Sequence, residues 1–145
     1  MKMVGRAPQP ELLAQHNGDD VIVTGKVSEV LPYYREALVA LVPLRSGGGT
    51  RLKIIEALAA GTPVVSTTVG CEGLEVTNGQ DILIADTPAT FAAAIERLLA
   101  ESQLAKDLSR AGRSLAEQRY DWALIAQTHE RVYEAAMGSP VGALG

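Results

Sequence analysis

The stretch from Pro43 to Thr67, PLRSGGGTRLKIIEALAAGTPVVST, decides the fold class of this chain. The apolar run Ala37–Val42 precedes it, and the pattern after the glycines predicts a helix over Arg51–Ala60 and a strand over Pro63–Thr67. Gly61 follows the helix at the position where a left-handed residue commonly ends one. A strand, a glycine-rich turn, a helix and a second strand in this order predict a βαβ unit.

The same alternation continues on both sides of this stretch. The apolar runs Met1–Val4, Val21–Thr24 and Ile82–Ile84 are further predicted strands, and helical patterns separate them. After Glu101 the pattern is helical throughout, with Asp121 as the expected N-cap of the last helix. Short strands that alternate with helices indicate a parallel sheet covered on both faces. The predicted fold class is therefore α/β, a doubly wound parallel sheet flanked by helices, with an all-helical C-terminal segment.

The composition is that of a globular domain. The 145 residues include 13 Lys and Arg against 17 Asp and Glu, which gives a net charge of −4, and 47% of them are hydrophobic. A chain of this length suits one domain. Its mild acidity argues against nucleic acid as a partner, because nucleic-acid binding needs clustered basic residues.

Disulfide, metal and membrane classes are also disfavoured. Cys71 is the single cysteine, so an internal disulfide is excluded and a reducing compartment fits best. With only two distant histidines, His16 and His129, the sequence predicts no metal site. There is no apolar signal-peptide core, and no run approaches the ~20 apolar residues of a membrane span. We therefore expect a cytoplasmic protein.

The glycine-rich turn is the first candidate for a binding site. Gly47, Gly48 and Gly49 lie between the end of a strand and the start of a helix, where open parallel sheets bind ligands. Glycines let backbone N–H groups approach a ligand, and the first turn of a helix attracts a phosphate or diphosphate. Arg45 and Arg51 add positive charge. The turn matches neither the Walker A pattern nor a GxGxxG fingerprint, so from the residues alone a flexible turn is an equal alternative.

Glu56 is the second candidate, because it interrupts an otherwise apolar helix. With Thr50 as the N-cap, Glu56 lies six residues into the helix, roughly 9 Å along its axis. That spacing fits a diphosphate at the helix tip and a ribose beside the helix. A carboxylate can accept hydrogen bonds from both ribose hydroxyls. The alternative is a surface glutamate paired with Lys53, and the residues leave the two interpretations even.

These residues resemble the C-terminal, donor-binding half of GT-B glycosyltransferases, in particular the retaining family 4, or glycosyl transferases group 1. The segment GGTRLKIIEALAAGTPVVST carries the second Glu of the family pattern as Glu56, followed by its Ala-rich turn, Gly, Pro and strand. Val21–Val27 and Val69–Ile84 are similar to flanking elements of the family. The resemblance runs from about Met3 to Tyr133. One departure is that Gly48 stands where the family has its first Glu, which contacts the donor sugar.

The resemblance implies a Rossmann-like donor-binding domain over residues 1–137 and a disordered tail over 138–145. It implies transfer of a sugar, of the hexosyl type, from a nucleoside-diphosphate sugar to an acceptor hydroxyl of a saccharide, a lipid or another molecule, as in polysaccharide biosynthesis. The domain's first strand and the N-terminal acceptor domain of the family are missing, so we expect this chain alone to be inactive. The full-length enzyme would be cytoplasmic or peripheral to a membrane. No metal or other cofactor is expected.

Site roles transfer by the same resemblance. Gly25, Lys26 and Val27 would border the nucleobase, and Glu56 would bind the ribose hydroxyls. No catalytic side chain is identified. The residues expected around the diphosphate are Arg45, Gly47, Gly48, Gly49, Thr50, Arg51 and Leu52.

Two other functions stay open at this point, and so does the oligomeric state. One is a nucleotide-sugar epimerase of the same architecture, which would need acid and base residues that the sequence does not reveal. The other is a non-catalytic nucleotide-binding module. The partners expected are the nucleotide-sugar donor and the missing N-terminal domain. Without that domain, an apolar stripe over Trp122–Ala136 would be left partly uncovered, which makes the last helix a candidate homodimer surface.

Overall fold

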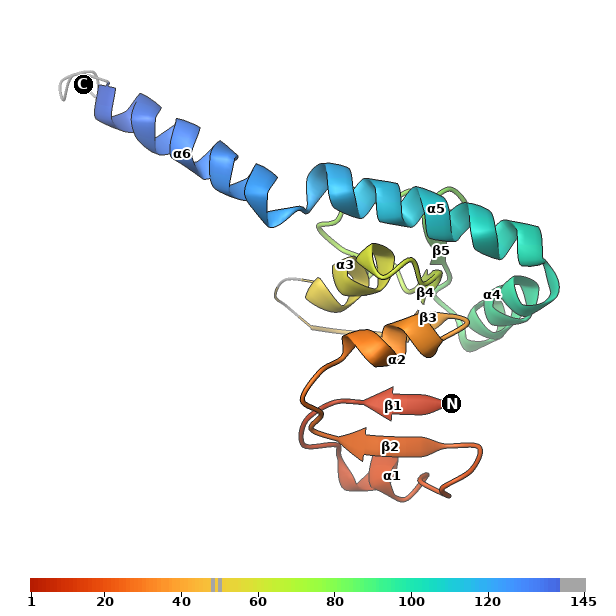
Figure 1. Cartoon of the computed structure of the whole chain (residues 1–145). Coiled ribbons are helices and arrows are strands. Elements are labelled where there is room, and N and C mark those ends of the chain that lie inside the picture. Colours follow the sequence, from red (N-terminus) through yellow and green to blue (C-terminus); the bar gives the residue numbers. More distant parts are fainter. Residues whose placement is uncertain (48, 50, 139–145) are drawn as a thin grey trace. The chain divides into compact units, whose positions relative to one another are not determined.

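A computed structural model describes residues 1–47, 49 and 51–138 of the chain (Figure 1). Two compact units make up the chain, Met1–Ala37 and Leu38–Gly145. Each unit has its own parallel sheet and its own helices. The units are therefore described one at a time.

The N-terminal unit pairs two parallel strands, with Lys2 opposite Ile22. Its last helix begins at Leu31, because Pro32 has no N–H to donate and is tolerated only in the first turn. The Lys2 ammonium is 2.9 Å from a Glu36 carboxylate oxygen and so connects the first strand to the end of this helix. The elements of the unit are β1 (Lys2–Val4), α1 (Pro10–Leu13), β2 (Ile22–Gly25) and α2 (Leu31–Glu36).

The C-terminal unit contains three parallel strands in the order β3-β4-β5. The α/β class and the parallel pairing are confirmed, although the strands form two sheets rather than one. The strands of this unit are β3 (Ala40–Val42), β4 (Val64–Ser66) and β5 (Leu83–Ile84). Its helices are α3 (Leu52–Ala59), α4 (Pro88–Ala100), α5 (Ser102–Arg119) and α6 (Trp122–Gly138).

The core of this unit lies where α3 and α5 meet the sheet. Val64 and Val65 of β4 are completely buried. Ile54 and Leu58 of α3 are at most 1% accessible. α5 approaches α3 at Gly112, where a Cβ atom would lie 2.5 Å from the Leu58 Cδ2 atom. Close packing of the two helices therefore depends on the absence of a side chain at this position.

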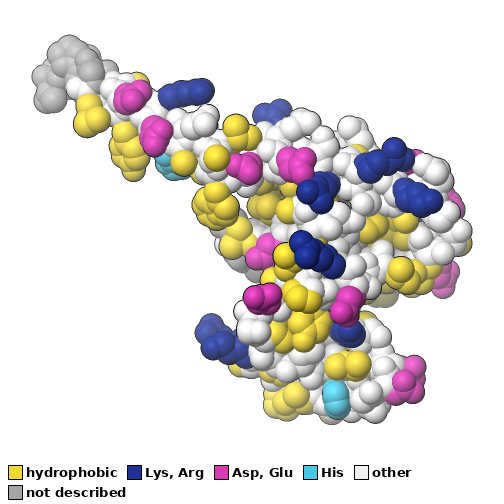
Figure 2. All heavy atoms as spheres, in the orientation of Figure 1, with side chains coloured by type: hydrophobic (Ala, Val, Ile, Leu, Met, Phe, Trp, Pro, Cys, Tyr) yellow, Lys and Arg dark blue, Asp and Glu magenta, His cyan; other side chains and the backbone are white. Residues whose placement is uncertain are grey.

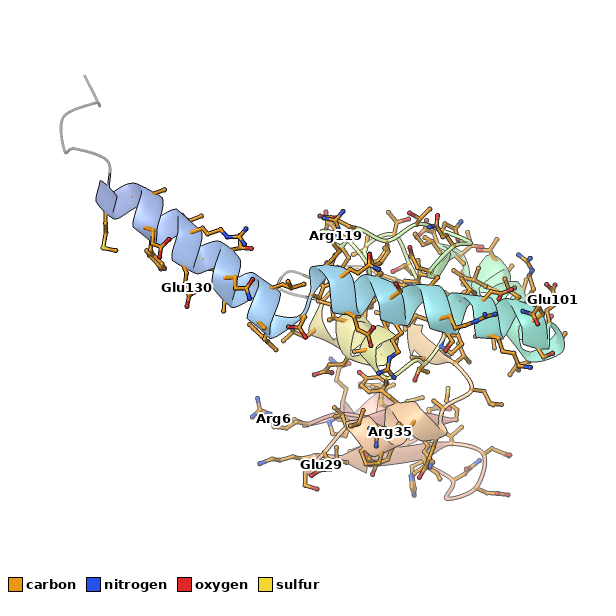
Figure 3. All side chains as sticks on the ribbon, turned by 45° about the horizontal axis from the view of Figure 1, so that its top comes forward. Arg6, Glu29, Arg35, Glu101, Arg119 and Glu130 are labelled. Carbon is orange, nitrogen blue, oxygen red and sulfur yellow. The ribbon has the colours of Figure 1, made fainter. Side chains whose placement is uncertain are left out.

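Local signals define the helix ends. The Thr87 hydroxyl accepts the Thr90 backbone N–H and caps α4. Glu101 has a non-helical backbone (φ −102°, ψ 82°) and separates α4 from α5. Glu101 and Arg119 lie at the two ends of α5 (Figure 3). The predicted cap of the last helix is confirmed, since a carboxylate oxygen of Asp121 accepts the Ala123 backbone N–H at 2.8 Å.

The predicted apolar stripe of the last helix is exposed. Trp122 is 75% and Tyr133 65% accessible, and hydrophobic side chains lie at the surface of α6 (Figure 2). Gly138 is the last residue of α6, and the rest of the tail predicted at 138–145 lies outside the described residues. In the described part of the chain, no helix is both long enough and apolar enough to cross a membrane.

Candidate functional site

The carboxyl ends of β3, β4 and β5 lie at one edge of the sheet, and hydrogen bonds join the loops that follow them. The Thr67 hydroxyl donates to the Leu44 carbonyl at 2.5 Å and accepts the Gly70 backbone N–H at 2.9 Å. A Cβ at Gly70 would lie 2.3 Å from Ser66 Oγ and 2.8 Å from the Val42 carbonyl oxygen. The β4 loop therefore packs directly against the end of β3, and only glycine fits there.

The β4 loop is also bound to the residues after β5. The backbone N–H and the hydroxyl of Thr68 donate to the two carboxylate oxygens of Asp86 at 2.7 and 2.8 Å. Both hydrogen bonds favour the charged carboxylate and lower the pKa of Asp86. Consequently the loops after all three strands form one hydrogen-bonded edge.

The far end of the β4 loop is held by the end of α5. The Glu75 backbone N–H donates to the Tyr120 hydroxyl at 2.7 Å, and the Arg119 guanidinium is 3.5 Å from the Glu75 carboxylate. Cys71, in the middle of the loop, is buried, and burial raises the pKa of its thiol. A buried, protonated thiol agrees with a packing role.

The glycine-rich turn takes backbone conformations that favour glycine. Gly47 has φ 143° and Gly49 has φ 91°, both in the range that side chains disfavour. Gly48 and Thr50, two other residues predicted around the diphosphate, lie outside the described residues. Arg51 is the N-cap of α3, one residue later than the N-cap assumed from the sequence.

The two arginines of the turn differ in environment. Arg45 is exposed. The Arg51 side chain is only 7% accessible, and its Nη2 donates to the Gly47 carbonyl at 3.0 Å. The same nitrogen is 3.5 Å from a carboxylate oxygen of Glu72 in the β4 loop. Of the two cations expected near a diphosphate, Arg45 faces solvent and Arg51 is held inside the edge.

Glu56 lies on the exposed face of α3, opposite the buried Ile54 and Leu58. The glutamate that interrupts the apolar pattern therefore faces away from the core. With Arg51 as the N-cap, Glu56 is five residues into the helix, about 7.5 Å along the axis. Leu52, one turn earlier on the same face, is exposed as well. An accessible carboxylate at this spacing suits a ribose that lies along the outside of the helix.

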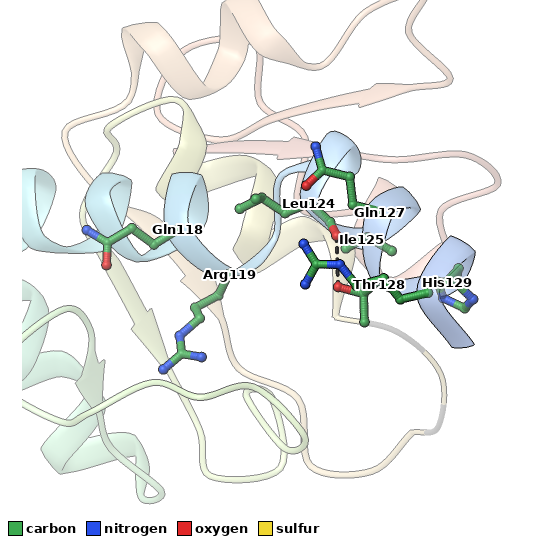
Figure 4. A pocket seen from close by; sticks show the side chains of 8 residues that line it. Gln118, Arg119, Leu124, Ile125, Gln127, Thr128 and His129 are labelled. Atoms are coloured by element: carbon green, nitrogen blue, oxygen red, sulfur yellow. Dashed lines mark hydrogen bonds between the residues drawn. The ribbon is translucent and has the colours of Figure 1, made fainter. Parts of the chain in front are cut away.

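The residues predicted to border a nucleobase lie in the N-terminal unit. Gly25 ends β2 with φ 70°, and Lys26 and Val27 follow at the carboxyl end of that strand. Val27 and Tyr33 are among the residues that line a hollow of about 400 Å³ beside α2. A second hollow of similar volume lies between α5 and α6 and contains none of the predicted site residues (Figure 4).

A family model described as glycosyl transferases group 1 matches residues 1–101. The chain belongs to this family. The resemblance found in the sequence is thereby confirmed. The fold agrees as well, since solved glycosyltransferase structures superimpose on the chain over most of its length.

Two relatives show what share of a longer protein this chain matches. A phosphatidyl-myo-inositol mannosyltransferase of Mycobacterium leprae is 31% identical over 96% of this chain and 39% of its own length. A sucrose-phosphate synthase of Thermosynechococcus elongatus is 28% identical, with a TM-score of 0.79, over 94% of this chain and 38% of the solved one. The chain thus spans about two fifths of each of these two relatives.

A third comparison concerns the fold alone. The Anabaena protein HepE, solved in complex with UDP-glucose, has a TM-score of 0.79 and 18% identity over 92% of this chain. The match spans 40% of the HepE chain. The parallel strands and flanking helices are therefore shared at low identity.

Some residues that join the loops at this edge of the sheet were missed by the sequence reasoning. Thr67, Thr68 and Asp86 join its loops, and Glu72 pairs with Arg51. Their partners lie 18 to 23 residues away along the chain, so no local spacing identifies them. The signal that was present is the run of hydroxyl residues at the end of the predicted strand Pro63–Thr67, because polar side chains at a strand's carboxyl end are candidates for loop contacts.

Proposed function

We propose that this chain is the donor-binding part of a retaining glycosyltransferase that transfers a sugar from a nucleoside diphosphate to an acceptor hydroxyl. The observation that carries the proposal is the joined loop edge at the start of α3. There, a turn with Gly47 and Gly49 in left-handed conformations leads into a helix N-terminus. A turn of this kind brings backbone N–H groups close to a ligand, and a helix N-terminus favours an anion.

The diphosphate is the part of the donor that needs the most electrostatic help. As the bond to the sugar breaks, negative charge builds on the departing diphosphate. Fixed amide groups and a nearby cation stabilise that charge more in the transition state than in the ground state. In this proposal the amides come from Gly47, Gly48, Gly49, Thr50, Arg51 and Leu52. Arg45, which is exposed, supplies the direct charge. No metal or other cofactor takes part.

The nucleoside is bound further from the turn. The Glu56 carboxylate accepts hydrogen bonds from the two ribose hydroxyls, and its exposed position on α3 supports this role. Gly25, Lys26 and Val27 border the base.

The acceptor and the catalytic step belong to a longer protein in this proposal. The chain spans 39% of the Mycobacterium leprae relative, and the acceptor is expected to bind to an N-terminal domain. We therefore expect the 145-residue chain to bind nucleotides without transferring sugar. Its cytoplasmic localisation remains a prediction.

Saturation-transfer NMR tests the proposal with the 145-residue chain and UDP, GDP and ADP. We expect at least one of the diphosphates to show saturation transfer, and the corresponding nucleoside to bind more weakly because it lacks the group that the helix N-terminus attracts. A nucleoside that binds as well as its diphosphate, or the absence of binding by all three nucleotides, would contradict the proposal.

A further inference from the structure

The most unusual charged group of the loop edge is the guanidinium of Arg51. Its side chain is only 7% accessible, whereas its partner Glu72 is 74% accessible. Burying a cation is costly unless hydrogen-bond acceptors replace the lost water. A guanidinium buried at a predicted anion site therefore requires an explanation from its contacts.

Those contacts come from both sides of the edge. Nη2 of Arg51 donates to the Gly47 carbonyl at 3.0 Å, within the glycine-rich turn. It is also 3.5 Å from Glu72, which lies 21 residues further along the chain in the β4 loop. Nε of Arg51 is buried and has no hydrogen-bond partner among the described residues. One nitrogen thus connects the two loops that flank the start of α3.

We propose that the side chain of Arg51 has a positioning role: it holds the glycine-rich turn against the β4 loop and does not itself contact the donor. Its effect on donor binding rests on the proposed function, but its effect on the loops does not. Because Arg51 donates a hydrogen bond to the Gly47 carbonyl oxygen, this partly negative atom does not turn toward an anion at the helix N-terminus. The turn is then preorganised to present N–H groups.

The guanidinium suits this role better than an ammonium group. It presents donors in a rigid plane and can serve two acceptors in fixed directions, which a lysine does not reproduce. To contact a diphosphate directly, Arg51 would have to leave its buried position and release Gly47. Arg45, in the same turn, is already exposed and needs no such rearrangement.

Hydrogen exchange of the unliganded 145-residue chain tests the loop contact, read by mass spectrometry over residues 43–55 and 66–77. In Arg51→Met and in Arg51→Lys we expect exchange in both segments to accelerate by about tenfold or more. Arg113→Met, at an exposed arginine paired with Glu117 on α5, is the control and should match the wild type. Wild-type exchange in Arg51→Met, or restoration of it by lysine, would overturn the proposal.

Glu72→Gln covers the case in which Arg51→Met does not fold. It removes the outer charge and leaves the buried guanidinium in place. We expect about threefold faster exchange over residues 66–77, because the β4 loop loses one of its contacts. If Arg51→Met is unfolded and Glu72→Gln exchanges like the wild type, the positioning role is overturned.

Measurements of nucleotide affinity distinguish this proposal from the proposed function. Affinity for UDP, GDP and ADP is measured at several salt concentrations. We expect Arg51→Met to bind about tenfold more weakly with an unchanged salt dependence, since no direct charge contact is lost. A reduced salt dependence in Arg51→Met would make it a direct ligand and overturn the proposal. If the wild type binds no nucleotide while the exchange difference persists, the donor site fails and the positioning role stands.

Discussion

Thr67 illustrates how single residues build the loop edge. Its buried hydroxyl donates to the Leu44 carbonyl and accepts the Gly70 N–H, so one side chain satisfies two backbone groups. Thr67→Val preserves the shape and removes both hydrogen bonds. We expect the free energy of unfolding to fall by about 1–3 kcal/mol, because buried polar groups are left unpaired.

Urea unfolding measures this loss, and Thr128→Val provides a matched control. Thr128 also donates to a backbone carbonyl, that of Leu124, but on the exposed α6. Its replacement should change the free energy of unfolding by less than about 0.5 kcal/mol. An equal effect of the two substitutions would mean that the Thr67 contacts contribute nothing beyond an ordinary surface hydroxyl.

Asp86 makes the stability of the edge depend on pH. Its pKa is lowered by the two hydrogen bonds from Thr68, so the contribution of its charge is fully present above the ordinary aspartate pKa of about 3.9. That contribution is lost as the pH falls through the lowered pKa. The stability difference between wild type and Asp86→Asn should therefore be largest near neutrality and shrink in acid below about pH 4.

Urea midpoints at a series of pH values measure this difference. Asp19→Asn, at an exposed aspartate of the N-terminal unit, controls for the loss of one surface charge. A difference between wild type and Asp86→Asn that grows in acid would contradict the account, because it would require a raised pKa.

The sequence identified the polar candidates but not what each one contacts. Glu56 was singled out as the interruption of an apolar helix, and it does lie on α3, although exposed rather than buried. Arg51 was assigned a charge contact with a diphosphate. Its bond to Gly47 depends on the path of the turn, and its pairing with Glu72 on a fold that brings distant loops together. Neither contact follows from residue spacing.

The approach of α5 to α3 depends on Gly112. In an exposed helix, Gly→Ala gains about 1 kcal/mol of helix propensity. Here the added Cβ would lie 2.5 Å from Leu58 Cδ2 and 3.1 Å from the Asp81 carbonyl oxygen. Because Leu58 is buried and cannot swing into solvent, we expect Gly112→Ala to destabilise the protein by about 1–3 kcal/mol.

Thermal unfolding decides the sign of this effect. Gly5→Ala is the control, since a Cβ at Gly5 has no neighbour within 4 Å and its backbone is not in the left-handed region. It should be close to neutral. A higher melting temperature for Gly112→Ala would show that propensity outweighs packing and that the two helices approach less closely than described.

Element positions were largely predictable because they follow from local patterns. The helix and the strand within PLRSGGGTRLKIIEALAAGTPVVST and the cap at Asp121 all carry signals in neighbouring residues. The division of the strands into two sheets could not be predicted, since strand pairing is a long-range property.

Helix α6 leaves apolar surface uncovered. Val132 and Tyr133 are exposed on this helix, which the sequence makes a candidate homodimer surface. We expect sedimentation velocity to show a dimer and Tyr133→Glu to shift it toward a monomer, because a charge opposes burial. Glu130→Gln, on the same helix, should leave the dimer intact. A wild type that is monomeric at all soluble concentrations would contradict this prediction.

The nucleotide site is tested most directly by titration calorimetry of UDP, GDP and ADP into the wild type and Glu56→Gln. The wild type should bind at least one of them, and Glu56→Gln should bind it at least about tenfold more weakly, a loss of about 1.4 kcal/mol, because the ribose hydroxyls lose a charged acceptor. Glu130→Gln is the control and should bind like the wild type. No heat from any of the three nucleotides, or equal affinities for the wild type and Glu56→Gln, would contradict the account.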